Sequence, residues 1–197
     1  MSPRRKLSLA DIADARAYER ERESFRARVI DLKARRRVGV GPYITLAFEN
    51  RETVRFQIQE MARVERIFTD EAIQTELDIY NSMIPEPGQL TATMFIELTS
   101  EPLLREWLPK LVGIERSLQI DVADGSTVRA VVDEQHDAQL TRADITSTVH
   151  YVRFEFSSAQ VAAFTRGATL VIDHPAYREA TPLSDTLRGG LRADLAD

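Results

Sequence analysis

Three histidines are the side chains of this sequence best suited to bind a metal ion or to act as a general base. His150 lies on a predicted strand, where it shares a face with apolar residues, and His174 lies in a turn at the end of another strand. A metal site or active site could gather His150, His174 and a carboxylate such as Glu60 from distant segments. The alternatives are a buried, neutral, hydrogen-bonded His150 and a His174 that only stabilises its turn. His136 lies in a polar loop and is expected to be solvated.

A second candidate site is a row of long polar side chains on one predicted helix. At helical spacing, the long polar side chains of one ridge share a face: Arg51, Arg55, Gln59, Arg63 and Arg66. Guanidinium groups bind carboxylates and phosphates through paired hydrogen bonds, so this face could bind an anionic ligand or an acidic partner. One alternative is a solvated helix surface with ordinary ion pairs to the interleaved glutamates. The other is a strand, because residues 53–58 also alternate, and a strand would dissolve the row.

The sequence excludes several classes of chemistry through what it lacks. It contains no cysteine, which removes disulfides, thiolate zinc sites, iron–sulfur ligation and thiol nucleophiles. It also has no phosphate-binding glycine loop, no nucleophile elbow and no His-Glu-x-x-His pattern. No motif therefore assigns a catalytic residue or a cofactor.

The charge distribution is asymmetric. Residues 1–37 carry twelve Lys or Arg against six Asp or Glu, whereas the whole chain has a formal net charge of −5. Net acidity opposes general nucleic-acid binding, so the basic end does not predict a nucleic-acid-binding protein. The first residues lack the apolar stretch of a secretory signal, and no window is long and apolar enough to span a bilayer. We therefore expect a cytoplasmic protein that does not bind membranes.

The first half of the chain is predicted to be mainly helical. Apolar residues recur at steps of three, four and seven in the segments 8–37, 51–68 and 70–80, as on one stripe of a helix. In the second of these segments the predicted inward stripe consists of Val54, Ile58, Met61, Val64 and Phe68. A strand is expected at 43–48, between the first two helices.

The second half is predicted to be mainly β-structure. Strands are expected at residues 90–98, 118–122, 128–132, 148–156 and 168–172. Asp124-Gly125 between two alternating segments is a strong hairpin signal. Short helices are expected after Ser100 and after Ser157, and a polar loop at 133–147. The predicted fold class is α+β, with a mixed, largely antiparallel β core, a helical N-terminal region and packed helices.

The expected domain organisation is one domain followed by a tail. Residues 1–177 contain all the predicted elements and are enough to bury a hydrophobic core. Residues 178–197 are polar and include Gly189-Gly190, so they predict a flexible tail.

Several motifs resemble one bacterial family, the domain of unknown function 3501. They are Arg35-Arg36-Arg37-Val38, Phe48-Glu49-Asn50-Arg51, the segment from Val54 to Met61, Val112-Gly113-Ile114-Glu115 and Asp173-His174-Pro175-Ala176-Tyr177. The resemblance covers residues 7–177 and implies no activity or catalytic residues. It does imply a setting, because such proteins are often associated with a rubrerythrin-like di-iron protein and an iron–sulfur oxidoreductase.

Two functional hypotheses follow. The first is a non-catalytic accessory or interaction protein that binds a redox partner, rubrerythrin-like or iron–sulfur, through the arginine row and the basic N-terminal helix. The second is a metal-binding protein or enzyme with the His and carboxylate site described above. Without cysteine, the chain itself could not hold an iron–sulfur cluster through thiolates.

Overall fold

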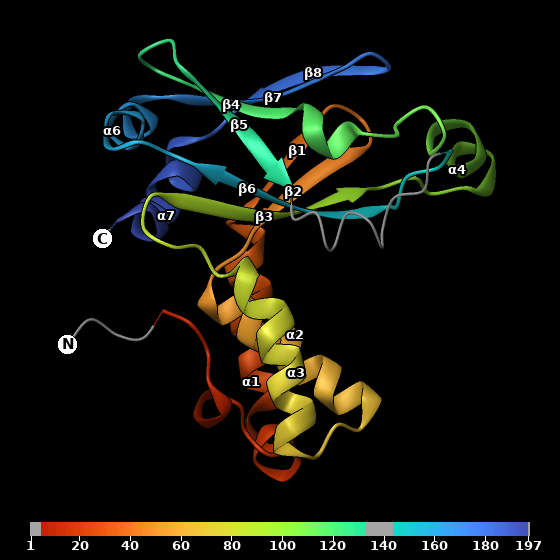
Figure 1. The fold of residues 1–197 in the computed structure, drawn as a ribbon, viewed down its shortest axis with the longest axis vertical. Helices are drawn as coiled ribbons and strands as arrows, with labels where there is room; N and C mark the ends of the chain where they lie inside the picture. Colours follow the sequence, from red (N-terminus) through yellow and green to blue (C-terminus); the bar gives the residue numbers. More distant parts are fainter. Residues whose placement is uncertain (1–4, 133–143, 197) are drawn as a thin grey trace.

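The computed structural model describes residues 5–132 and 144–196, and it shows a strongly curved sheet from which three helices project as an arm (Figure 1). The arm consists of η1 (Leu9–Asp11), α1 (Ala15–Ala34), α2 (Arg51–Glu65), α3 (Asp70–Tyr80) and η2 (Asn81–Met83). The strands are β1 (Arg37–Val40), β2 (Ile44–Phe48), β3 (Gln89–Ile96), β4 (Leu118–Val122), β5 (Thr127–Val132), β6 (Val149–Glu155), β7 (Ala168–His174) and β8 (Tyr177–Pro182). The other helices are α4 (Glu101–Trp107), η3 (Ile114–Ser117), α6 (Ser158–Arg166) and α7 (Asp185–Leu195).

The eight strands form an almost closed barrel in the order β1-β2-β3-β6-β5-β4-β7-β8. Neighbouring strands are antiparallel throughout, which confirms the predicted α+β class. At the seam between β1 and β8, the Tyr177 hydroxyl donates to the Val40 carbonyl (2.7 Å) and accepts from the Tyr43 amide (3.0 Å). Gly41 crosses this seam with a φ of +65°, and a Cβ there would lie 2.5 Å from the Tyr177 hydroxyl oxygen. Only glycine fits this close approach.

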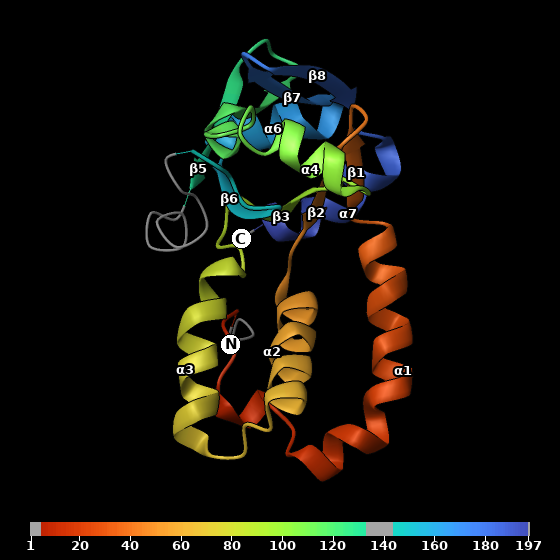
Figure 2. The same cartoon turned by 90° about the vertical axis from the view of Figure 1, so that its right-hand side faces the viewer.

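The arm helices run side by side away from the barrel, with α2 next to α1 on one side and α3 on the other (Figure 2). The predicted helix over 51–68 is confirmed as α2, and the strand alternative is wrong. The Asn50 side chain accepts from the Thr53 amide (3.0 Å), while the Thr53 hydroxyl accepts from the Asn50 amide (2.9 Å). This reciprocal cap starts a helix, and its buried residues then recur every four positions, at Val54, Ile58 and Ala62.

The predicted helix over residues 8–37 is broken at both ends. Its first turns are η1 and an extended connection, and α1 begins only after Asp14, whose carboxylate caps it by accepting from the Ala17 amide (2.8 Å). At the other end α1 stops at Ala34, and Arg37 already belongs to β1, a strand the sequence pattern did not indicate. Arginines are common in the last turn of a helix, and the run Arg35-Arg36-Arg37 therefore predicted that the helix continues to residue 37. In the structure this run extends into the edge strand β1, so the predicted end of the helix is three residues too late.

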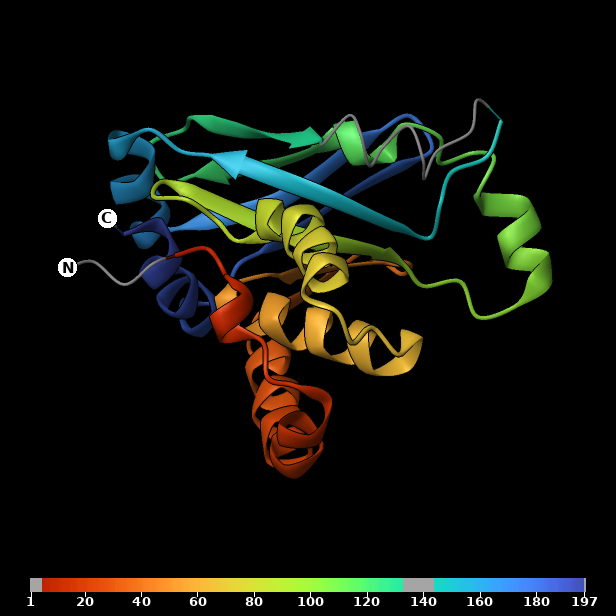
Figure 3. The same ribbon diagram turned by 60° about the horizontal axis from the view of Figure 1, so that its bottom comes forward.

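The predicted flexible tail over residues 178–197 is corrected by the structure. Its first residues form β8, which pairs with β7, and the next ones form α7, which packs against the barrel (Figure 3). Four leucines at steps of four carry this packing, and each is at most 5% exposed: Leu183, Leu187, Leu191 and Leu195. The start of the described chain lies against the same helix, because Arg5 donates to the Asp194 carbonyl (3.3 Å).

Most of the predicted polar loop, including His136, lies outside the described residues. The other predicted strands and helices are present with shifts of a few residues at their ends, and Pro109 lies just beyond α4. In the described part of the chain, no helix combines the length and the apolar character needed to cross a membrane.

Candidate functional site

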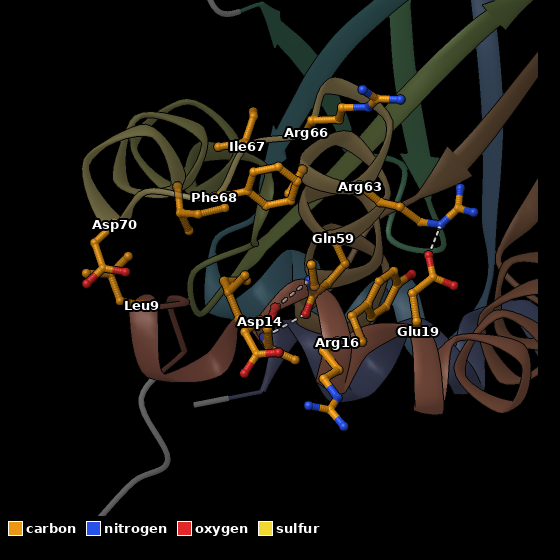
Figure 4. Close-up of a pocket in the computed structure, with 16 residues that line it drawn as sticks. Leu9, Asp14, Arg16, Glu19, Gln59, Arg63, Arg66, Ile67, Phe68 and Asp70 are labelled. Carbon is orange, nitrogen blue, oxygen red and sulfur yellow. Dashed lines mark hydrogen bonds and ion pairs between the residues drawn. The ribbon is translucent and has the colours of Figure 1, made fainter.

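One end of the arm lies farthest from the barrel (Figure 2), and a cavity of about 580 Å³ opens there (Figure 4). We call it the tip pocket. Its lining residues are Leu9, Ile12, Ala13, Asp14, Ala15, Arg16, Tyr18, Glu19, Gln59, Ala62, Arg63, Arg66, Ile67, Phe68, Asp70 and Ile73. The tip pocket has the size of a typical binding site and, like one, it is lined by apolar side chains with a few polar groups among them.

Three helix ends meet around the tip pocket. The first turn of α1 and the first turn of α3, capped by Asp14 and Thr69, lie beside the last turn of α2. Arg66 ends α2 in the left-handed conformation (φ 57°, ψ 44°), and the following amide, that of Ile67, donates to the Ala62 carbonyl (2.9 Å). This sharp end of the helix aims Ile67 and Phe68 at the pocket (Figure 4).

The pocket has a buried apolar wall and an exposed apolar rim. Ala62 and Ile73 are nearly buried, whereas Phe68 is 70% exposed. Val64, in the last turn of α2, is also 70% exposed but does not line the pocket. Both were predicted to lie on the inward stripe of α2, and the structure corrects this, because the free end of the arm leaves them without a packing partner in the described part of the chain.

Gln59 closes the floor of the pocket. It is 2% exposed, its carbonyl oxygen accepts from the Ala13 amide (2.8 Å), and its amide group donates to the Ala13 carbonyl (3.2 Å). These two bonds hold the segment before α1 against α2. A buried side-chain amide that satisfies a backbone group in this way makes the pocket a preformed feature of the arm.

The arginines of the predicted row face α1 and the segment before it. Arg55 donates to the Asp11 carbonyl (2.8 Å) and pairs with Glu21 (2.9 Å), and its guanidinium lies 4.7 Å from the centre of the Phe25 ring. Arg51 pairs with Asp11. The first part of the row thus joins the helices of the arm, and only its far end, Gln59, Arg63 and Arg66, reaches the tip pocket.

Glu60 lies in the same interface between α1 and α2. Its carboxylate accepts from Arg22 through both oxygens (2.8 and 2.9 Å) and from the Tyr18 hydroxyl (2.7 Å). The hydrogen bond from Arg22 is the main cause that lowers the pKa of Glu60. Burial, and then the bond to this carboxylate, raise the pKa of Tyr18. Glu60 is therefore a charged structural partner in the arm.

Replacing Glu60 by glutamine should lower the free energy of unfolding by about 1 kcal/mol at neutral pH, since two donors lose a charged acceptor. The pKa of Glu60 is lower in the folded than in the unfolded state, so its stabilisation is present above the unfolded value of 4.5 and is lost as the pH falls through the folded value. Urea unfolding at neutral pH and near pH 3 measures both effects. A difference between wild type and variant that stays the same at the two pH values would contradict this role.

His150 is buried on β6 and its ring is already bonded. Its Nε2 lies 2.9 Å from the Thr146 hydroxyl and 3.0 Å from the Ser147 carbonyl, and its Nδ1 lies 4.0 Å from a carboxylate oxygen of Glu115. A carbonyl only accepts hydrogen bonds, so Nε2 carries a proton and cannot take one from Thr146. The Thr, His and Glu therefore do not form a nucleophile with its general base in this arrangement.

His174, at the end of β7, is also fully bonded. Its Nδ1 accepts from the Ala176 amide (3.2 Å), so its Nε2 bears the proton that goes to the Val112 carbonyl (3.2 Å). The structure does not bring His174, His150 and Glu60 together, because both histidines belong to the barrel and Glu60 to the arm. Within residues 5–132 and 144–196, no group of three His, Asp or Glu side chains could hold a metal ion.

Comparison with known proteins places the chain in a family. A family model described as protein of unknown function, DUF3501, matches residues 6–195. The chain belongs to DUF3501. The resemblance drawn from the sequence motifs is thus confirmed, and for this DUF3501 protein the match extends through β8 and α7, beyond the motifs themselves.

One solved structure is similar to this chain over nearly its whole length. The crystal structure of a novel protein of unknown function from Burkholderia pseudomallei is 36% identical to this DUF3501 protein, with a TM-score of 0.88. The similarity covers 96% of this chain and 99% of the other. No curated protein matches the chain. Neither the description of the family nor that of the Burkholderia pseudomallei protein names a function.

Sequence reasoning found Gln59, Arg63 and Arg66 but missed the rest of the tip pocket. The available signal was local: Phe68 stands directly before Thr69, the cap of α3, at a place where a turn exposes its residues. Arg16, in the first turn of α1, carries no such signal, because its position at the pocket depends on how α1 packs against α2.

Proposed function

We propose that this protein is a non-catalytic accessory protein that binds a partner protein through the tip of its helical arm. The observation that carries the proposal is Phe68, an exposed aromatic side chain at the rim of a preformed cavity, with a second exposed apolar side chain, Val64, in the last turn of α2. Exposed aromatic side chains next to a pocket are typical anchors of protein interfaces. The arm projects away from the barrel (Figure 2), so a partner can reach its end.

The internal contacts of the arm support this role. Gln59, Arg55 and Glu60 bind α1 to α2 through hydrogen bonds and ion pairs, so the tip is held in place before any partner binds. Preorganisation of this kind reduces the entropy lost on association. The class of partner is taken from the family resemblance, which implies a redox protein of the rubrerythrin-like or iron–sulfur kind.

The double variant Val64→Ser and Phe68→Ser should lose at least about tenfold in affinity for the partner, because burying such side chains contributes about 1.5–3 kcal/mol each. Its thermal stability should change little, since both side chains are 70% exposed. The measurement is affinity capture of the tagged protein from its native host, with the bound proteins identified and metals quantified in the same eluate.

The matched control is Ile30→Ser, which removes an apolar side chain on α1 that is 51% exposed and does not line the pocket. Capture should be unaffected by this change. Equal recovery of the partner by wild type and the double variant would show that the partner binds elsewhere. The charge reversals Arg55→Glu and Arg63→Glu are poor tests, because both arginines hold α1 to α2.

A further inference from the structure

A second cavity, of about 150 Å³, lies where the arm meets the barrel, and we call it the junction pocket. Four segments that are far apart in the sequence line it: the start of the described chain at Arg5, the start of α2, residues 84–85 before β3, and the end of α7. The pocket therefore contacts the arm and the barrel at once. A water molecule takes about 30 Å³ in the liquid, so the pocket has room for a group of about five non-hydrogen atoms.

Two arginines and one acid are the charged residues that line the junction pocket. The acid, Asp194, pairs with Arg36, which is 4% exposed. The first lining arginine, Arg51, pairs with Asp11. These two ion pairs offset each other's charges, so the charge left over at the pocket is that of the second lining arginine.

This second arginine, Arg5, bonds to backbone carbonyls. Its guanidinium donates to the carbonyls of Pro85 (3.4 Å), Asp194 (3.3 Å) and Ala196. Carbonyl groups hold the guanidinium in place but carry no net charge to offset it. With Arg5, the pocket and its paired residues hold three arginines against two acids, which leaves one positive charge.

The start of α2 adds N–H groups that need an acceptor. The Nε of Arg51 is buried and has no hydrogen-bond partner in the part of the chain that the structure describes. Arg51 and Glu52 are the first residues of α2, and the first amides of a helix have no acceptor within the helix. The Asn50 side chain accepts only from the amide of Thr53 (3.0 Å). The positive end of this 15-residue helix thus lies at the same pocket.

We propose that the junction pocket binds an oxyanion of the size of phosphate, held by Arg5, Arg51 and the first amides of α2. Arginine forks and the amino ends of helices are groups through which proteins bind phosphate and carboxylate. An oxyanion in this pocket contacts α2 of the arm and α7 of the barrel together, so it fixes the orientation of the arm. The inference goes beyond the proposed function and does not depend on a partner at the tip.

Titration of the full chain with inorganic phosphate, followed through its amide NMR spectrum, tests the inference. The resonances of Arg51, Glu52 and Asp194 should shift and saturate with one dissociation constant of about 1 mM or less. Sodium chloride at the same ionic strength should not shift them. Arg5→Gln should weaken binding at least about tenfold, because it removes the charge that no carboxylate offsets. Ala193→Leu should do the same, because it fills the pocket from α7 and keeps every charge.

The control is Arg192→Gln, an exposed arginine of α7 that does not line the pocket, and it should keep the wild-type affinity. Unshifted resonances elsewhere in the spectrum show that each variant is folded. Equal shifts with chloride, wild-type affinity in both pocket variants, or an equal loss in Arg192→Gln would overturn the inference. The proposed function is judged separately, by capture of the native partner with the Val64 and Phe68 variants.

Discussion

Removing residues 183–197 should leave no folded protein. The deletion takes away α7 and exposes the barrel core that Leu183, Leu187, Leu191 and Leu195 cover. Truncating a single buried leucine to alanine costs about 2–5 kcal/mol, and the whole stability of a domain is about 5–15 kcal/mol. Losing four such side chains therefore exceeds what the rest of the fold can supply. Circular dichroism and soluble yield of the truncated chain measure the result.

Point variants separate the packing of α7 from general effects of truncation. Leu191→Ala should lower the free energy of unfolding by about 2–5 kcal/mol, because Leu191 is fully buried. Gly190→Ala should raise it by about 0.5–1 kcal/mol, since this glycine lies inside α7 and a Cβ there meets no atom within 4 Å. If neither variant changes the urea midpoint, these residues do not form a packed helix.

Replacing Arg36 by alanine should cost about 3–5 kcal/mol of stability. Arg36 is 4% exposed and donates to the carbonyls of Phe48 (2.8 Å) and Glu49 (2.9 Å). It also pairs with Asp194 of α7, whose carboxylate is itself largely buried. Without the guanidinium, a buried charge and two buried carbonyls lose their partner. Urea unfolding of wild type and variant gives the difference.

The neighbouring arginine provides a matched control. Arg35 pairs with Asp31 on the surface of α1, and the two side chains are 63% and 72% exposed. Arg35→Ala should therefore change the free energy of unfolding by no more than about 1 kcal/mol. Similar effects of the two substitutions would show that Arg36 does not join the arm, β2 and α7 in the way the structure indicates. The double variant Arg36→Met and Asp194→Leu should recover only the part of the loss that comes from the unpaired Asp194 charge, because methionine cannot donate to the Phe48 and Glu49 carbonyls.

The sequence predicted most elements because their signals are local. The hairpin at Asp124-Gly125, the capped helix after Ser157 and the stripe of α2 need only nearby residues to be recognised. The tail was mispredicted because α7 contains Gly189-Gly190 and only a few leucines, and its stability comes from packing against the barrel. Tertiary contacts can override weak local propensity in this way.

The candidate site was predictable only in part, and for a related reason. Residue types suggested that Arg51 and Arg55 could bind a ligand, but whether an arginine is free or paired depends on which acids fold next to it. Asp11 and Glu21 come from the segment before α1 and from α1 itself, and periodicity cannot place them opposite α2. His174 shows the same limit, because one of its two hydrogen-bond partners, the Val112 carbonyl, is a backbone group of a distant loop.

The most direct test of the arm as a binding device is photocrosslinking in the native host from position 68, with position 30 on α1 as the control. A photoreactive residue in place of Phe68 should crosslink to one partner protein, and a photoreactive residue in place of Ile30 should not. A partner that is captured by the protein but crosslinks no more from position 68 than from position 30 would contradict the proposal that it binds at the tip of the arm.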